Sequence, residues 1–324
     1  MAEEIDWEIP EPAQPKPEEF TFDLDEALLS VVGVQAAIPE DAFTAQTLGT
    51  MRSGSGIVIR ESGLVLTIGY LITEAQTIWL TTSDGRAIAG TVAAYDQETG
   101  FGLVQALGRL GVPALPLGNS SKLETGAPVI VAAGGRRQSV SARLIAKQEF
   151  AGTWEYLLDE ALFTAPAHPF WGGAALLNEE GKLVGVGSLH VQQSMPMSAP
   201  RDINMIVPID LLTPILDELL TYSRPHHPPR PWLGVYTNET EGRVVIAGVL
   251  PKGPAAAAGI RVGDIVWAVR DEAVNSLADF YRKLWATGSA GVEIPVELVR
   301  DGRTVWVRVK SRDRGSMLKK NSLQ

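Results

Sequence analysis

The sequence predicts a mainly β protein with two domains. From Leu28 to about Ile209 the chain is a series of short aliphatic and β-branched runs, separated by turn residues. Strands this short, at this spacing, are typical of a barrel or a sandwich. A Pro-rich stretch from Arg224 to Pro231 then precedes a second set of strands and helices. A chain of 324 residues is also too long for one small core, which favours two domains.

Two hairpin turns stand out within the β-rich region. The segments Ser83 to Arg86 and Asn178 to Lys182 each place a glycine after an acidic residue, where a tight turn requires a positive φ. The segment from Asp210 to Tyr222 predicts a helix instead, because its leucine and isoleucine residues recur along one face. Strands followed by one helix therefore account for the first domain.

The second domain follows a stiff linker. Proline fixes φ and removes a backbone donor, so the stretch from Arg224 to Pro231 supports neither helix nor sheet. Beyond it we expect a strand from Leu233 and another from Arg243 to Val249. A helix is expected from Leu277 to Trp285, and the Asp-Gly pair at Asp301 turns a last hairpin. This mixture indicates an α+β domain.

The composition excludes several classes of protein. The formal net charge of -10 argues against nucleic acid as a partner, because no basic stripe offsets the acidic surface. The chain has no cysteine, which rules out disulfides, thiolate nucleophiles and cysteine-based metal sites. Its 4 histidines are scattered without ligand spacing, so we expect neither a metal nor another cofactor.

The N-terminal residues argue for a cytoplasmic location. Residues 1–20 are acidic and Pro-rich, where a secretory signal needs a basic start and an apolar core. The next apolar run, Ala27 to Ile38, is shorter than the roughly 20 residues that span a bilayer. We therefore expect no membrane span. A periplasmic location would require that the true start lies upstream.

Six stretches of the chain carry a resemblance to a known family. They are GSGIVIRESGLVLT (54–67), DGRAIAGTVAAYDQETGFGLVQ (84–105), ALPLGNSSKLETGAPVIVAAG (114–134), HPFWGGAALLNEEGKLVGVGS (168–188), NMIVPIDLLTPILDEL (204–219) and GPAAAAGIRVGDIVWAV (253–269). Taken in this order, they resemble the HtrA/Deg family of trypsin-like serine proteases, whose members carry a C-terminal PDZ domain. The resemblance implies a chymotrypsin/trypsin-like double six-stranded β-barrel followed by a PDZ domain.

This resemblance divides the chain into five parts. They are a disordered, acidic and Pro-rich N-terminus (1–24), the trypsin-like double β-barrel domain (25–222), the Pro-rich linker (223–231), the PDZ domain (232–312) and a flexible tail (313–324). The resemblance also implies a homo-oligomer, because family members form trimers.

The resemblance places the three catalytic positions at Tyr70, Gly100 and Gly172, none of which carries the family's histidine, aspartate or serine. A serine hydrolase needs a hydroxyl nucleophile, a nearby imidazole to accept its proton and a carboxylate to orient that imidazole. Glycine supplies no nucleophile, and a tyrosine with a pKa of about 10 is a poor base at neutral pH. We therefore expect no catalytic residue at these positions.

Two aromatic residues stand beside the serine position. The family's oxyanion hole depends on a glycine two residues before the serine, where this chain has Phe170, and Trp171 follows it. We expect both rings to pack in the former cleft rather than to stack on a ligand. A displaced triad stays open as an alternative, although His168 lies only four residues before Gly172 and the other histidines do not follow the first-barrel strand either. The serines of the Ser-Gly-Ser-Gly stretch near Ser55 are more typical of a turn.

The PDZ resemblance implies one binding site. Such domains hold the carboxylate of an extended peptide on backbone N–H groups of a Gly-containing loop. A Trp-Leu-Gly-Val stretch matches that loop, an arginine before it adds positive charge, and two apolar residues of the expected helix share one face. The predicted site residues are Arg230, Trp232, Leu233, Gly234, Val235, Leu277 and Phe280. Plain core packing is the alternative role for several of them.

Three functions compete at this stage. The first is a catalytically inactive HtrA-like homologue that binds protein or peptide C-termini, or acts as a scaffold, through its PDZ domain. The second is a serine endopeptidase of the trypsin-like class with a non-standard active site. The third is a holdase-like chaperone in protein quality control. The residues favour the first, because the side chains of all three catalytic positions are missing.

Overall fold

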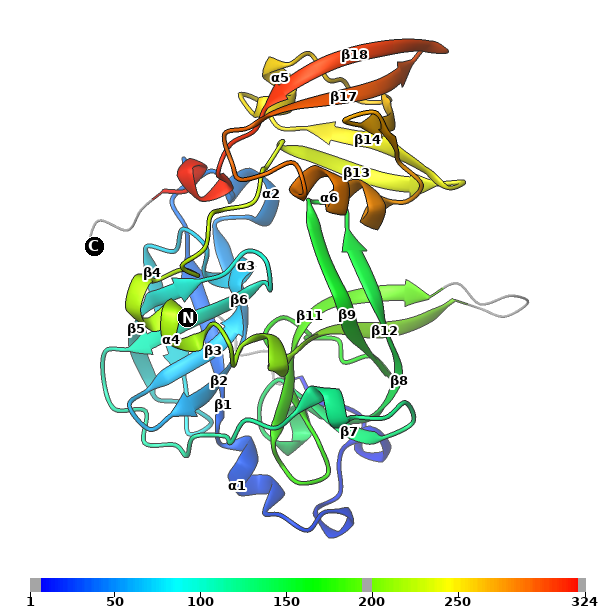
Figure 1. Cartoon of the computed structure of the whole chain (residues 1–324). Coiled ribbons are helices and arrows are strands. Elements are labelled where there is room, and N and C mark those ends of the chain that lie inside the picture. The colour runs from blue at the N-terminus through cyan, green and yellow to red at the C-terminus, as the bar shows by residue number, and fades with distance from the viewer. Residues whose placement is uncertain (1–6, 194–199, 320–324) are drawn as a thin grey trace. The chain divides into compact units, whose positions relative to one another are not determined.

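The computed structural model describes residues 7–193 and 200–319, and these form two compact units (Figure 1). The first unit comprises the described residues of Met1–Gln148, Glu160–Pro225 and Lys319–Gln324. The second unit comprises Glu149–Asp159 and His226–Leu318. Within the described part of the chain, no helix is long and apolar enough to cross a membrane.

Six strands close the first barrel in the order β1-β2-β3-β6-β5-β4, coloured blue to cyan in Figure 1. They are β1 (Val31–Ala37), β2 (Met51–Arg60), β3 (Leu64–Ile68), β4 (Thr77–Thr81), β5 (Ala87–Tyr95) and β6 (Phe101–Ala106). Buried aliphatic side chains such as Val34, Leu66 and Leu80 belong to its core. Gly85 has a φ of 82° between β4 and β5, which confirms the first expected hairpin turn.

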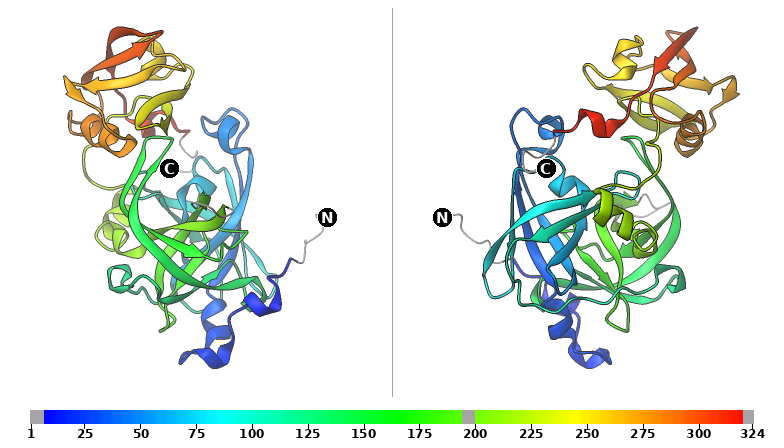
Figure 2. Two further views of the ribbon diagram at one scale, coloured as in Figure 1. Left: turned by 90° about the vertical axis from the view of Figure 1, so that its right-hand side faces the viewer. Right: turned by 60° about the vertical axis from the view of Figure 1, so that its left-hand side comes forward.

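The second barrel repeats this plan in the order β10-β11-β12-β9-β8-β7. Its strands are β7 (Pro128–Ala132), β8 (Ser139–Gly152), β9 (Tyr156–Ala165), β10 (Ala175–Leu177), β11 (Leu183–Gln193) and β12 (Arg201–Pro208). Gly181 has a φ of 73° between β10 and β11, as the second expected turn requires. Figure 2 shows β8 and β9 as a long green hairpin in both views. Two closed six-stranded barrels confirm the expected fold of the first domain.

The helices of the first unit are short. They are α1 (Leu24–Leu28), α2 (Ala45–Leu48), α3 (Gly69–Ile72) and α4 (Leu216–Tyr222), with the 3-10 turns η1 (Glu11–Ala13), η2 (Pro17–Glu19), η3 (Ser120–Lys122), η4 (Arg136–Gln138) and η5 (Ile209–Leu211). The helix expected from Asp210 to Tyr222 forms only in part. Pro214 has no N–H to donate and lies in the break between η5 and α4.

The prediction of disorder over residues 1–24 is wrong for residues 7–24. This segment forms η1 and η2, and Ile9 packs into the core of the second barrel with 5% of its surface exposed. The Ile9 N–H also donates to a carbonyl of η4 at 2.8 Å. Two apolar side chains, Trp7 and Ile9, anchor an otherwise acidic segment, which the average composition does not reveal. The first six residues of the chain lie outside the described residues.

The prediction of a flexible tail over residues 313–324 is wrong as far as Lys319. The side chain of Asp313 caps η6 (Arg314–Met317). The Lys319 N–H donates to Glu74 Oε1 at 2.8 Å. Capping and hydrogen bonding thus order this segment without any apolar periodicity. The remaining residues of the tail lie outside the described residues.

The second unit combines one sheet with two helices. Its strands are β13 (Val235–Thr240), β14 (Arg243–Val249), β15 (Ile265–Val269), β16 (Glu272–Ala273), β17 (Glu293–Arg300) and β18 (Arg303–Lys310). They follow the order β13-β14-β15-β17-β18, with β16 paired to β15. The helices are α5 (Pro254–Ala257) and α6 (Leu277–Trp285). Ser276 Oγ begins α6 by accepting from the Asp279 N–H at 3.1 Å, so this helix forms where it was expected.

One segment of the second unit comes from the strands of the second barrel. This segment, Glu149–Asp159, is called the hairpin tip below; it contains the end of β8, the turn and the start of β9. The sequence assigns it to the barrel domain. In the structure its Leu157 belongs to the same buried cluster as Leu233 and Phe280. Tertiary contacts, rather than position in the chain, decide which unit the hairpin tip joins.

Candidate functional site

The three positions of the expected triad lie together in the first unit. Tyr70 is on α3, directly after β3, and a β-carbon at Gly172 would lie 2.9 Å from the Tyr70 hydroxyl oxygen. The Gly69 N–H donates to Gly100 O at 2.6 Å, so the third position is adjacent to the residue before Tyr70. The backbone therefore brings the three expected positions close together, and none of them carries a histidine, aspartate or serine side chain.

Tyr70 acts as a hydrogen-bond donor and not as a base. Its hydroxyl donates to Ser188 O at 2.9 Å. Desolvation by burial raises the pKa of this phenol above its ordinary value, and a hydrogen bond with the Trp171 side chain acts in the opposite direction. The hydroxyl therefore stays protonated at neutral pH and has no capacity to take a proton from a nucleophile.

The turn that would present the catalytic aspartate is intact without its carboxylate. Asp96 Oδ2 accepts from the Thr99 N–H at 2.9 Å and from the Thr99 hydroxyl at 2.6 Å. The chain then passes through Gly100 with a φ of 84°, in the left-handed region that favours glycine. The Asp96 carboxylate serves this local turn, so it is not a substitute for the missing group at position 100.

The backbone N–H two residues before Gly172 is already engaged. The Phe170 N–H donates to His168 Nδ1 at 3.0 Å, so the other ring nitrogen, Nε2, carries the proton and donates to Gln138 O at 3.0 Å. Burial lowers the pKa of His168, which keeps the ring neutral. In the family this N–H position serves the oxyanion hole; here it orients a buried histidine.

Phe170 does not fill the cleft as expected. It is 48% exposed, and its ring centroid lies 3.9 Å from that of Trp7. Trp171 lies beside His190, with ring centroids 5.2 Å apart. The prediction that both rings pack in the former cleft is therefore wrong for Phe170, because the N-terminal segment supplies its partner at the surface.

The side chains that could form a displaced triad make other contacts. Both ring nitrogens of His168 are engaged as described above. His190 Nε2 lies 3.7 Å from Asp202 Oδ1, on the neighbouring strand β12. The Ser55 hydroxyl is buried and donates to Ala133 O at 3.0 Å. Both ring nitrogens of His168 and the Ser55 hydroxyl are thus engaged in other contacts, and His190 is paired with a carboxylate.

In the second unit, three backbone N–H groups converge on one side-chain carboxylate. These groups belong to Trp232–Val235, called the carboxylate loop below. Glu155 Oε1 accepts from the N–H of Gly234 at 2.7 Å and of Val235 at 3.1 Å, and Oε2 accepts from that of Leu233 at 2.9 Å. Gly234 has a φ of 77°, which lets successive N–H groups point to the same side. The loop that the sequence predicts therefore binds a carboxylate.

Two side chains that the sequence reasoning missed complete this site. The Tyr281 hydroxyl, on α6, donates to Gly152 O at 2.7 Å and accepts from the Glu155 N–H at 3.1 Å. It also lies 2.7 Å from Thr237 Oγ1 on β13. The Thr237 N–H donates to Thr153 O at 2.8 Å. The hairpin tip is therefore bound by β13 and α6 together, as a peptide strand would be.

Glu155 is a buried carboxylate in an unusual conformation. Its side chain belongs to a residue that is 5% exposed, and its φ of 59° lies in the left-handed region. Burial raises the pKa of Glu155 to about 7, while the N–H groups of the carboxylate loop and the charge of Arg314 act to lower it. No sequence signal identifies this residue, which lies 78 positions before Leu233.

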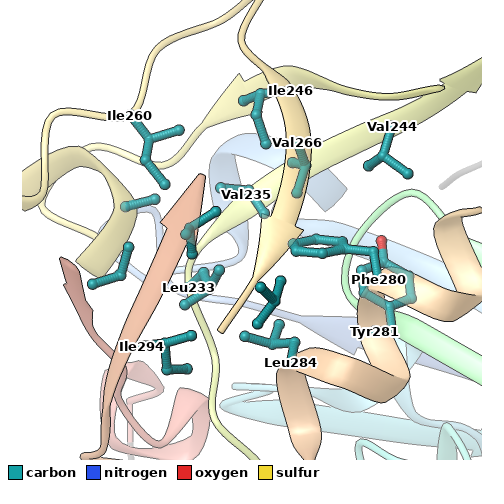
Figure 3. Close-up of a cluster of buried hydrophobic side chains, with 14 of the residues drawn as sticks. Leu233, Val235, Val244, Ile246, Ile260, Val266, Phe280, Tyr281, Leu284 and Ile294 are labelled. Carbon is teal, nitrogen blue, oxygen red and sulfur yellow. The ribbon is translucent and has the colours of Figure 1, made fainter. Parts of the chain in front are cut away.

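The other predicted site residues are mostly part of the core. Figure 3 shows Leu233, Val235 and Phe280 in the buried cluster, and Leu277 is also buried in it. The Arg230 guanidinium carbon lies 4.4 Å from the centroid of the Trp285 ring, and the charge of Arg314, which the sequence did not single out, acts on the bound carboxylate.

Family models match both units. Residues 54–186 match a trypsin-like peptidase domain, and residues 231–310 match a PDZ domain. The chain is 26% identical over 279 residues to the probable periplasmic serine protease do/HhoA-like of Haemophilus influenzae, covering 79% of this chain and 57% of that relative. It is 24% identical to the serine endoprotease DegS of Salmonella typhimurium, covering 90% of this chain and 85% of the relative.

The solved structures agree on the fold. The HtrA-type protease AlgW, solved with a decapeptide, matches with a TM-score of 0.53 at 20% identity, over 90% of this chain and 97% of that chain. Fold and sequence thus define a trypsin-like domain followed by a PDZ domain. The chain belongs to the HtrA family.

The expected cytoplasmic location is wrong in the light of these relatives. Besides the Haemophilus influenzae protein, a DegP-like relative from Pseudomonas putida and DegQ from Escherichia coli are named as periplasmic proteases. The expectation depended on the composition of the N-terminal residues and on the short apolar run from Ala27 to Ile38. The chain spans little more than half the length of these three relatives.

Proposed function

We propose that this chain is a catalytically inactive HtrA homologue that binds protein or peptide C-termini through its PDZ unit. The observation that carries the proposal is the carboxylate loop, whose three N–H groups hold a carboxylate with hydrogen bonds as short as 2.7 Å. A C-terminal carboxylate presents the same two oxygens to these donors. The chemistry of the loop therefore fits a peptide terminus.

The rest of the site supports an extended peptide with an apolar last residue. The edge of β13 offers the Thr237 N–H, and the facing helix offers the Tyr281 hydroxyl, so both can bind peptide carbonyls. Leu233, Val235 and Phe280 are buried beside the loop, in one cluster with Leu157 of the hairpin tip. Main-chain pairing would supply affinity, and a last side chain that takes the place of Leu157 in this cluster would be selected for its apolar character.

The arrangement of the first unit supports the loss of catalysis. Gly172 offers no nucleophile, Tyr70 is a donor, and the Phe170 N–H is held by His168. A protease that loses its triad still keeps about 10³–10⁴-fold acceleration from its oxyanion hole and substrate binding. Since one donor of that hole is engaged here, we expect even this residual rate to be absent.

Calorimetry on the full chain tests the binding proposal. The ligands are one peptide with an apolar last residue, as the free acid and as the C-terminal amide. Charge-assisted hydrogen bonds are roughly twice as strong as neutral ones, so amidation should weaken binding about tenfold or more, or about 1.4 kcal/mol. A second free acid with the same last two residues and a scrambled remainder serves as the control. Equal affinities for acid and amide would contradict the proposal.

Serine endoproteolysis, the activity in the names of the relatives, is the competing proposal, favoured by the retained backbone arrangement at the triad positions. Reaction with a serine-directed probe separates the two. Family membership also leads us to propose a homo-oligomer, with a trimer as the expected state, which light scattering on the purified chain measures.

A further inference from the structure

We propose that the hairpin tip is an internal ligand of the PDZ unit, and that a peptide C-terminus binds by displacing Glu155 from the carboxylate loop. This inference rests on the proposed peptide binding and names its regulation. The ligand that the loop holds in this structure is the chain's own side chain.

Glu155 and a peptide C-terminus need the same N–H donors of the carboxylate loop, so they cannot both be bound. Each backbone N–H has one hydrogen, and those of Leu233, Gly234 and Val235 are all directed to Glu155 at 2.7 to 3.1 Å. A terminal carboxylate that enters the loop needs the same three hydrogens. Binding of one carboxylate therefore requires departure of the other.

The hairpin tip also occupies the peptide's place on β13. Thr153 O accepts from the Thr237 N–H at 2.8 Å, next to the carboxylate loop in the chain. Gly152 O accepts from the Tyr281 hydroxyl at 2.7 Å. These are main-chain contacts of the kind that an added strand makes, so the tip resembles a bound peptide in its backbone as well as in its carboxylate.

The conformation of Glu155 indicates that the contact is specific. A non-glycine residue in the left-handed region costs about 1 kcal/mol or more, and burying a carboxylate adds a desolvation cost. Glu155 bears both, with a φ of 59° and 5% exposure. A glycine at this turn would avoid both costs. The hydrogen bonds of the loop offset them, which ties this residue to the loop and not to the turn.

Ion pairs also hold the hairpin tip, but they do not contribute to the carboxylate site of Glu155. Arg282 on α6 pairs with Glu149 at 2.5 Å and with Asp159 at 2.5 Å, at the two ends of the tip. These ion pairs are exposed, so each contributes little to stability on its own. The buried contact of Glu155 is therefore the contact that a competing carboxylate must overcome.

Fluorescence anisotropy on the full chain tests displacement, with a labelled free-acid peptide ending in an apolar residue as the probe. Glu155→Gly removes the carboxylate and relieves the backbone strain, so this chain should fold and bind the peptide at least about tenfold more tightly than the wild type. Glu155→Gln keeps the size of the side chain but replaces one of the two oxygens that accept from the loop with an amide nitrogen, which cannot accept, so it should give an intermediate gain. Glu160→Gln, which removes a carboxylate paired with Lys147, is the matched control and should leave affinity unchanged.

Hydrogen exchange separates failure of this inference from failure of peptide binding. Without peptide, the N–H groups of Leu233, Gly234 and Val235 should exchange faster in the Glu155→Gly chain than in the wild type. Equal peptide affinity in both chains, with equal exchange, would overturn the inference while peptide binding stands. Faster exchange with no peptide binding in either chain would overturn the proposed function and, with it, displacement.

Discussion

The former catalytic cleft and the carboxylate loop differ in which atoms carry their chemistry. In a trypsin-like cleft, catalysis depends on three side chains, and we propose that Tyr70, Gly100 and Gly172, which the backbone brings together, stand where those side chains would be. In the loop, function depends on backbone N–H groups, which nearly every residue type supplies. Chemistry that side chains carry is removed by a few substitutions, whereas chemistry that the backbone carries persists as long as the fold does.

Restoring the triad side chains tests whether they alone separate the cleft from that of an active protease. The chain with Tyr70→His, Gly100→Asp and Gly172→Ser should remain at least about 100-fold slower than an active family member on a fluorogenic peptide, since losing one oxyanion donor alone costs about 10²–10³-fold. The Phe170 N–H stays bound to His168, and aspartate at position 100 would adopt the strained φ of 84°.

The triple variant needs a folding control, because a β-carbon at position 172 would lie 2.9 Å from the hydroxyl oxygen of Tyr70. Circular dichroism of the triple variant should match the wild type, since Tyr70→His removes that overlap. Turnover near that of an active relative would show that side chains alone separate this chain from a protease.

A second prediction tests whether the cleft backbone is rigid. Gly173→Ala should destabilise the first unit by about 3 kcal/mol or more, measured by urea unfolding. The new β-carbon would lie 1.9 Å from Ser55 O, at a φ of 78°. Gly126→Ala is the matched control, because position 126 has a φ of 96° but nothing within 4 Å of the added carbon. Similar losses in both variants would mean that backbone strain alone, and not the close approach, accounts for the effect.

A third prediction tests whether the loop needs its glycine. Gly234→Val should weaken binding of a free-acid peptide about tenfold, because a β-branched residue at a φ of 77° displaces the N–H groups from their common direction. Gly242→Val, in the β13–β14 turn at a φ of 69°, carries similar strain away from the loop. It should lower the melting temperature and leave peptide affinity unchanged. Equal losses of affinity in the two variants would contradict a role of the loop backbone.

The smallest expected effect is the dependence of peptide binding on pH. Burial raises the pKa of Glu155 to about 7 in the bound hairpin tip, from an ordinary 4.5 after release. The bound tip therefore holds a proton more tightly, so its docking is strongest below pH 4.5 and weakens as the pH rises through 7. Peptide affinity of the wild type should rise by up to about tenfold from pH 6 to pH 8.

Among the described residues, Arg314 and Tyr281 act on Glu155. Arg314 contributes a guanidinium charge, and burial raises the pKa of Tyr281 above its ordinary value, so this phenol stays neutral between pH 6 and pH 8. The Glu155→Gln chain should therefore show no rise in affinity with pH. A rise of the same size in that chain would assign the effect to another group.

Local patterns in the sequence predict turns, strands and helices better than they predict which distant residues pack together. The turns at Gly85 and Gly181 need a positive φ, which glycine signals directly, and both form. Pro214 likewise signals a break, since it removes a helical donor, although the apolar face around it suggested one continuous helix. The packing of Trp7 and Ile9 against the second barrel was not predicted, because the average composition of the N-terminal segment is acidic and two apolar side chains change it little.

The carboxylate loop can be predicted from the sequence, whereas Glu155, the residue that it binds, cannot. The glycine of the loop and its apolar neighbours are contiguous, so a resemblance finds them. Glu155 contacts the loop from 78 positions away, at a turn where its left-handed φ would have suggested glycine. Tyr281 and Thr237 are also indistinguishable from core residues until the tertiary structure brings them beside the hairpin tip. Contacts between distant segments are set by packing, which a local pattern does not encode.

Intact-mass spectrometry after treatment with a serine-reactive fluorophosphonate tests most directly that side-chain chemistry is lost from the cleft. The native full chain should gain no adduct under conditions that fully label an active HtrA protease. A single adduct on one serine of the native chain, abolished by prior heat denaturation, would contradict this expectation.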